Sequence, residues 1–152
     1  MLAALFLLSA VVTQPLPSPM SPSPSARADH LALHVADLDR SVAFYTRYFG
    51  LQPMQAAARI STIRWLQAGS FELHLIGGRT KPVQVPIDVH LAFRVQDLAA
   101  VMARLDADKI AWSDSDGNPH VTQTRRDGIR QLYLQDPDGY WLEVNELPKL
   151  AG

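Results

Sequence analysis

The sequence predicts an α+β fold built from two paired modules, each with the element order βαβββ. The first observation is an internal repeat: residues 30–38 (HLALHVADL) recur at 90–98 (HLAFRVQDL) with six of nine positions identical. The second is that each copy begins with alternating apolar residues, as a strand does, and continues with apolar residues at helical spacing. The third is that short strand-like segments separated by turn-forming residues follow in each copy.

The first 28 residues differ from the rest of the chain. Residues 1–12 are apolar at every position but Ser9, and residues 13–28 are rich in proline and serine. The apolar run is too short to span a bilayer but has the length of a signal-peptide core, and the Pro/Ser stretch predicts an extended tether. We therefore expect residues 1–28 to be a signal peptide and tether that direct the protein to the periplasm or outside the cell. If this leader is an overextended start instead, the protein is cytoplasmic.

Residues 29–148 form a single predicted domain, with module one at about 29–78 and module two at about 86–147. The chain has no cysteine, which excludes disulfides, thiolate metal sites and a cysteine nucleophile. Its net charge of −1 and its 19% of charged residues do not indicate a nucleic acid or an acidic membrane surface as partner. We expect a small-molecule substrate, no nucleic-acid partner and no membrane span in the mature protein.

Module one is predicted to begin with a strand over residues 30–35. Alternation places His30 and His34 on the face opposite to the apolar residues of this strand. A helix is then expected between Asp37, a natural N-cap, and Gly50, a natural residue at a helix end. Three further strands are expected near residues 52–57, 61–67 and 70–76.

Module two is predicted to repeat this order, beginning with a strand over residues 90–95. His90 and Arg94 share its polar face, and Asp97 is the expected cap of the following helix. Residues 136–139 (DPDG) are a strong turn signal before the last strand. The strands that follow the helix are expected near residues 110–113, 119–124, 129–135 and 140–146.

Each module has a histidine at the start of its first strand and a glutamate in its last. These residues are His30 and Glu72 in module one, and His90 and Glu143 in module two. When the modules pair, the four side chains would generate a pseudo-twofold site of two imidazoles and two carboxylates, which suits a divalent ion such as Zn, Ni, Mn, Fe or Co. His74 shares the face of Glu72 and is an alternative ligand or a substrate-binding residue.

Two further side chains are candidates for substrate binding. His34 and Arg94 share faces with His30 and His90, and Arg94 could hold an anionic substrate group. Residues 113–128 are rich in turn formers and charge, so they form either a mobile flap over the site or a solvated hairpin connection.

Two segments carry a resemblance to a known superfamily. Residues 29–51 (DHLALHVADLDRSVAFYTRYFGL) and 131–146 (QLYLQDPDGYWLEVNE) resemble the opening and closing segments of vicinal oxygen chelate (VOC) proteins, the glyoxalase/bleomycin resistance protein/dioxygenase superfamily. The resemblance extends over about residues 29–147. It implies that the two βαβββ modules form curved mixed sheets with a metal in the cleft between them.

The resemblance also implies a ligand set and an activity. His30, Glu72, His90 and Glu143 match the four metal ligands of glyoxalase I, whereas extradiol dioxygenases and thiol transferases of the superfamily match only three, without Glu72. A glyoxalase-like lyase or isomerase is therefore expected, acting on a small substrate that chelates the metal through two neighbouring oxygens. Glu143 is the expected catalytic base, with Glu72 as the symmetric alternative.

The resemblance leaves the metal, the reaction and the co-substrate open. Proton abstraction needs no redox metal and favours Ni or Zn, whereas oxygen chemistry would need Fe or Mn. His34 and Ile76 stand where glyoxalase I has residues that contact glutathione, so glutathione is only one of the thiol co-substrates to test. The alternatives are an extradiol-type dioxygenase, a thiol transferase or a non-catalytic binding protein. A homodimer is expected because each short module leaves sheet edges to cover.

Overall fold

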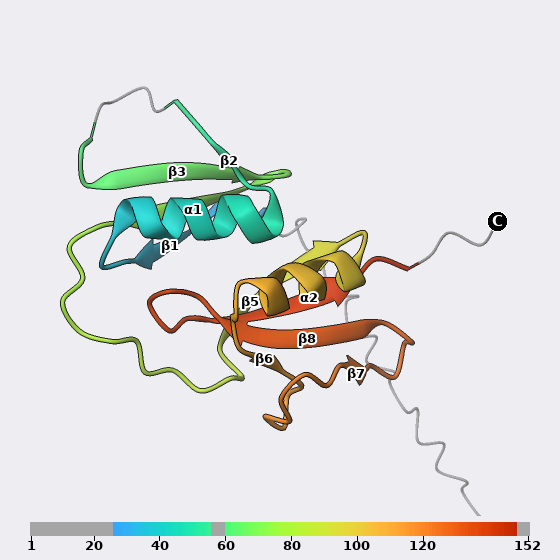
Figure 1. Ribbon diagram of the computed structural model, residues 1–152. Coiled ribbons are helices and arrows are strands. Elements are labelled where there is room, and N and C mark those ends of the chain that lie inside the picture. Colours follow the sequence, from blue (N-terminus) through green and yellow to red (C-terminus); the bar gives the residue numbers. More distant parts are fainter. Residues whose placement is uncertain (1–25, 56–59, 149–152) are drawn as a thin grey trace, which may run out of the picture.

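The computed structural model describes residues 26–55 and 60–148, which form two consecutive modules of the same α+β design (Figure 1). The predicted fold class is confirmed. Residues 1–25 of the expected leader lie outside the described residues. The elements of module one are β1 (His30–His34), α1 (Leu38–Phe49), β2 (Gln52–Pro53), β3 (Ile63–Ala68) and β4 (Phe71–Ile76). Those of module two are β5 (His90–Val95), α2 (Leu98–Ala107), β6 (Trp112–Ser113), β7 (Gln123–Thr124), β8 (Arg130–Gln135) and β9 (Trp141–Glu146).

Each module builds its own mixed, curved sheet. Module one has the strand order β1-β4-β3-β2, and module two has the order β5-β9-β8-β6, with β7 also pairing with β8. The first strand of each module is parallel to the last, and the other pairs are antiparallel. As a result β1 and β5, which carry the two repeated histidines, are edge strands of their sheets.

Both helices begin at the predicted caps. The Asp37 carboxylate accepts a hydrogen bond from the Arg40 amide, and the Asp97 carboxylate accepts one from the Ala100 amide. Helix α1 ends at Gly50, whose φ of 68° lies in the left-handed region that glycine adopts without steric cost. These local signals set where α1 and α2 begin.

The alternation predicted for the first strand is present. Leu33 and Val35 are buried in the core, whereas His30 and His34 are exposed on the opposite face. In module two, β8 and β9 are buried on both faces, and their second face carries polar side chains rather than apolar ones. The strands expected near 52–57, 110–113 and 119–124 are shorter than predicted, at two residues each, and residues 56–59 lie outside the described part.

The two modules are held together by contacts of α1 with α2 and with the turn between β8 and β9. The Asp138 carboxylate accepts hydrogen bonds from the Ala36 amide at 2.7 Å and from the Ser41 hydroxyl at 3.3 Å. The hydroxyl of Tyr45, in α1, donates to Asp136 at 2.7 Å. The predicted DPDG turn therefore also makes polar contacts between the modules. No helix in residues 26–55 and 60–148 is long and apolar enough to cross a membrane.

Candidate functional site

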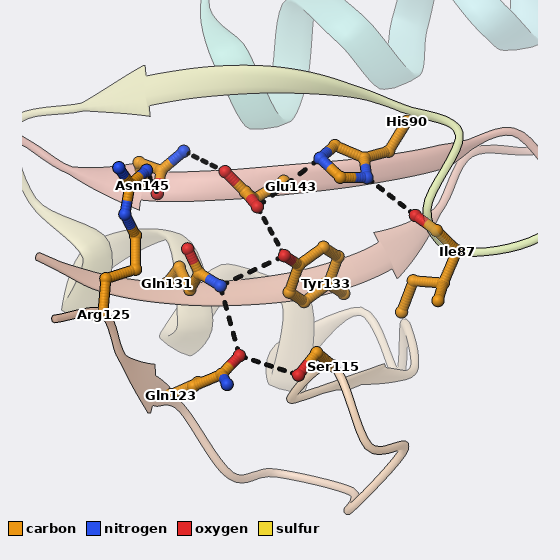
Figure 2. Close-up of polar contacts among 9 residues, drawn as sticks. All are labelled: Ile87, His90, Ser115, Gln123, Arg125, Gln131, Tyr133, Glu143 and Asn145. Carbon is orange, nitrogen blue, oxygen red and sulfur yellow. Dashed lines mark hydrogen bonds and ion pairs between the residues drawn. The ribbon is translucent and has the colours of Figure 1, made fainter.

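His90 and Glu143 form the module-two half of the predicted site. His90 begins β5 and Glu143 lies in the neighbouring strand β9, and Figure 2 shows their side chains pointing toward each other, with 3.5 Å between His90 Nε2 and Glu143 Oε2. His90 Nδ1 donates to the Ile87 carbonyl oxygen at 2.7 Å. Since that carbonyl only accepts, Nδ1 carries a proton, and Nε2 is the ring nitrogen that faces the carboxylate.

The geometry of this pair suits a bound cation. An imidazole nitrogen and a carboxylate oxygen that face each other at 3.5 Å are both groups that bind divalent cations. A histidine whose other ring nitrogen is fixed by a carbonyl is also the usual arrangement of a metal-binding histidine. The chemistry of His90 and Glu143 therefore fits a divalent cation.

Both oxygens of Glu143 are held by neighbouring donors. The Tyr133 hydroxyl donates to one oxygen, and the Asn145 side-chain amide donates to the other at 2.5 Å. Only 8% of Glu143 is exposed. Burial, and then the hydrogen bond to the Glu143 carboxylate, raise the pKa of Tyr133, so the phenol keeps its proton and acts as a donor. Sequence reasoning missed Tyr133 and Asn145 as site residues, although both face the same side of the sheet as Glu143 by strand alternation.

The hydrogen-bond network continues from Glu143 to the segment 113–128. The Gln131 amide donates to the Tyr133 hydroxyl at 3.1 Å and to the Gln123 side-chain oxygen at 3.2 Å. The Ser115 hydroxyl donates to the same Gln123 oxygen at 2.8 Å (Figure 2). For this segment the sequence allowed two interpretations, a mobile flap or a solvated connection. In the structure, Ser115 and Gln123 of the segment lie against the polar face of β8.

Module one presents its candidate residues closer to solvent. His74 Nε2 donates to a Glu72 carboxylate oxygen at 2.9 Å, and the His74 ring stacks on His30 with 4.1 Å between ring centroids. His30 Nδ1 in turn donates to the Asp29 carboxylate at 2.8 Å. The exposed fraction of the Glu72 side chain is 38%, against 11% for Glu143. Module one therefore gathers His30, Glu72 and His74 into an open cluster rather than a buried one.

The strand register shows that the two halves are not exact copies. In module two, Glu143 lies opposite Ala92, two residues after His90 at the start of β5. In module one, the residue opposite the corresponding Ala32 is His74, and Glu72 lies two residues earlier. His74 therefore occupies the ladder position of Glu143. The similarity of the segments around Glu72 and Glu143 in the sequence does not reveal this shift, because register depends on the partner strand.

The two halves remain separate within one chain. In residues 26–55 and 60–148, no three histidine or acidic side chains are grouped so that they could hold a metal ion. His30 and His90 nevertheless line one groove of about 450 Å³, together with apolar side chains of both modules. The structure thus brings the predicted ligands together as His30 with Glu72, and as His90 with Glu143, but does not join the two pairs.

The other two predicted substrate-binding residues lie at the far ends of the edge strands. His34 is exposed, and its backbone amide donates to the Tyr140 hydroxyl at 3.3 Å. Arg94 is exposed on the face of β5 that carries His90, and it lines a second pocket between the modules.

Comparisons with known proteins agree with this architecture. A family model described as the glyoxalase/bleomycin resistance protein/dioxygenase superfamily matches residues 27–144. A curated relative, the uncharacterized protein YwbC of Bacillus subtilis (strain 168), is 26% identical over 124 residues, which cover 77% of this chain and 94% of YwbC.

Solved structures show the same fold. The oxidase ChaP-H2 superposes with a TM-score of 0.67 at 20% identity, over 85% of this chain and 99% of that protein. A lactoylglutathione lyase from Agrobacterium tumefaciens superposes with a TM-score of 0.58 at 25% identity, over 86% of this chain and 99% of that protein. One of these proteins is named an oxidase and the other a lyase. Similarity of fold therefore does not identify the reaction.

Proposed function

The chain belongs to the glyoxalase/bleomycin resistance protein/dioxygenase superfamily, and from that premise we propose that it is a metal-dependent, glyoxalase-like lyase or isomerase. Its substrate would be a small molecule that presents two neighbouring oxygens. The observation that carries this proposal is the His90–Glu143 pair, in which a fixed imidazole faces a buried carboxylate at 3.5 Å.

Four side chains would hold the divalent ion: His90 and Glu143 from module two, and His30 with either Glu72 or His74 from module one. The ion would act as a Lewis acid that stabilises negative charge on the substrate oxygens. Glu143 would take up the proton from carbon, because its carboxylate is held in place by Tyr133 and Asn145 and shielded from bulk water. Glu72, more exposed, is the symmetric alternative as base.

We propose that a second copy of the chain completes the site. Each chain presents two incomplete clusters of ligands, one per module, and a twofold dimer would place module one of one chain against module two of the other. Such an arrangement would form two equivalent sites per dimer and would cover the exposed edge strands β1 and β5.

Metal analysis of the purified protein tests the proposal. Wild-type protein is expected to bind one divalent ion per chain, measured by elemental analysis and titration calorimetry, and to convert methylglyoxal with one or more thiols under anaerobic conditions. Glu143→Ala is expected to lower the metal affinity by about tenfold or more, because a direct ligand is lost. If wild-type protein binds no stoichiometric metal, or if Glu143→Ala leaves the titration unchanged, the proposal fails.

Two matched variants decide the fourth ligand. Glu72→Ala should weaken metal binding strongly if the ligand set is that of glyoxalase I. His74→Ala should do so if the ladder position equivalent to Glu143 supplies the ligand instead. Cobalt substitution gives a second readout, since the visible absorption of bound Co²⁺ reports on the ligands replaced.

The strand register favours a second candidate function. With Glu72 outside the ladder position of Glu143, a ligand set of only His30, His90 and Glu143 becomes the alternative. Three ligands are what the sequence resemblance associates with extradiol dioxygenases and thiol transferases. Oxygen uptake with a catechol in the presence of Fe²⁺ would identify the dioxygenase, and the anaerobic assay with methylglyoxal separates it from the lyase.

A further inference from the structure

Module one carries apolar side chains on the same face of its sheet as the predicted ligands. In the β3–β4 ladder, Trp65 lies opposite His74 and Ile63 lies opposite Ile76. Residues directly opposed in an antiparallel pair point to the same side of the sheet, and the Trp65 ring meets the His74 ring edge-on, with 5.9 Å between centroids. The His74 ring in turn stacks on His30. An apolar surface of Ile63, Trp65 and Ile76, called the Trp65 face below, therefore adjoins the His30–His74 cluster.

The Trp65 face is separate from the hydrophobic core. The core of module one lies on the other side of the sheet, where Leu66 and Leu73 are fully buried together with side chains of α1. Ile76 is 36% exposed, and Ile63 and Trp65 are partly exposed. A sheet that meets water on one side ordinarily carries polar residues there. Apolar side chains at all three positions indicate that an apolar group covers this face in the working protein.

Module two carries polar side chains at the equivalent positions. Two cross-strand pairs of each module occupy the same ladder positions relative to the first strand: Trp65–His74 corresponds to Tyr133–Glu143, and Ile63–Ile76 corresponds to Gln131–Asn145. In module two these side chains form a hydrogen-bonded network, in which Tyr133 and Asn145 donate to the Glu143 carboxylate. When module one and module two face each other across one site, one wall of the site is therefore polar and the other is apolar.

We propose that the Trp65 face determines substrate specificity, and that the substrate carries a flat apolar group, an aryl ring, beside its two chelating oxygens. This inference rests on the proposed function. The oxygens would lie toward the ion and the polar wall of module two, and the ring would lie against Trp65 and Ile76. Ring packing on an aromatic side chain favours a planar group, and the removal of this apolar surface from water supplies affinity that a methyl group does not reach.

Benzohydroxamate and acetohydroxamate test this assignment, because both chelate a divalent ion through the same two oxygens but carry a phenyl ring or a methyl group. In titration calorimetry with full-length protein loaded with Zn²⁺, benzohydroxamate is expected to bind about tenfold more tightly. Trp65→Ala should weaken benzohydroxamate binding by about tenfold and change acetohydroxamate binding by less than about twofold, whereas Trp65→Phe should keep most of the preference. Val42→Ala is the matched control, since it shortens a partly exposed apolar side chain of α1, which packs on the other side of the sheet.

A second variant tests the face without removing the tryptophan. Ile76→Asn gives module one the residue that module two has at the equivalent position, and it changes a side chain that is 36% exposed, so the melting temperature should stay close to that of wild type. It is expected to lower the preference for benzohydroxamate by about threefold.

The outcomes separate this inference from the proposed function. If wild type binds both hydroxamates equally, or if Trp65→Ala weakens both equally, the assignment of the Trp65 face is wrong while the metal site stands. A change from dimer to monomer in Trp65→Ala, measured by light scattering, would mean that the second chain covers this face, and it would also overturn the assignment. Wild-type protein that binds neither hydroxamate would contradict the proposed function, and this inference with it.

Discussion

Glu143 is the residue on which the proposed chemistry depends, and Tyr133 is the residue that holds it. The phenol donates to one carboxylate oxygen, while the His90 ring packs edge-on to the Tyr133 ring at 5.5 Å between centroids. Tyr133 thus contacts both members of the His90–Glu143 pair. A hydroxyl that fixes the direction of a metal-binding carboxylate affects affinity without touching the ion.

We expect Tyr133→Phe to lower metal affinity and activity by about 10- to 100-fold, because Glu143 loses one of its two donors. Removal of this buried hydrogen bond should also lower the free energy of unfolding by about 1–2 kcal/mol. Calorimetric metal titration and urea unfolding measure the two effects. Tyr140→Phe is the matched control, since it removes a tyrosine hydroxyl that, in the described part of the chain, bonds only to the backbone of His34. Equal metal affinities for wild type and Tyr133→Phe would exclude this role for Tyr133.

At the scale of elements, the sequence predicted two kinds of feature: the ends of helices, which local capping residues mark, and the faces of strands, which the alternation of apolar and polar residues marks. Asp37 and Gly50 bound the first helix where expected, and alternation identified the face that carries His30 and His34. The position of His74 relative to Glu143 could not be read in this way. It depends on which residues of β1 and β4 pair, and a shift of two residues preserves the alternation in both strands.

The β8–β9 turn shows a second limit. Its sequence Asp136-Pro137-Asp138-Gly139 predicted a turn, and the same carboxylates also join the modules. An aspartate that caps a turn and one that bridges two modules look alike in sequence. The distinction comes from the partners Tyr45 and Ala36, which lie about 100 residues away in the chain.

This turn predicts a pH dependence of stability. Burial raises the pKa of the Asp136 carboxyl above its usual 3.8, although hydrogen bonds from Tyr45 and the backbone oppose the shift. The folded protein therefore binds more protons at this group than the unfolded chain does. Its stabilising contribution is present below pH 3.8 and is lost as pH rises through the raised pKa.

Asp136→Asn should remove this dependence, because an amide does not ionise in this range. The difference in unfolding free energy between variant and wild type should then grow in favour of the variant above pH 3.8, by at most about 1.4 kcal/mol per pH unit, and level off at higher pH. Urea unfolding at several pH values between 3.5 and 7 measures the difference. Asp138→Asn is the control, and a slope for Asp136→Asn no different from wild type would contradict the prediction.

At the scale of the whole molecule, duplication was readable from the sequence, but the way in which the halves meet was not. The chain packs its modules through α1, α2 and the β8–β9 turn (Figure 1). Arg47 of α1 forms a two-bond pair with Asp108 at the end of α2, at 2.6 and 2.8 Å. These contacts join the modules without bringing His30 and Glu72 to His90 and Glu143.

Mixing two inactive variants decides whether a second chain supplies the missing ligands. If each site combines module one of one chain with module two of its partner, His30→Ala and Glu143→Ala are each defective alone. A heterodimer of the two has one site with both changes and one site with all native ligands. Random mixing gives half heterodimers, so about a quarter of the wild-type metal sites should return. Co-refolding the two variants and measuring tight metal binding checks this value. Sites formed within single chains would show no recovery, because each chain would keep its own defect.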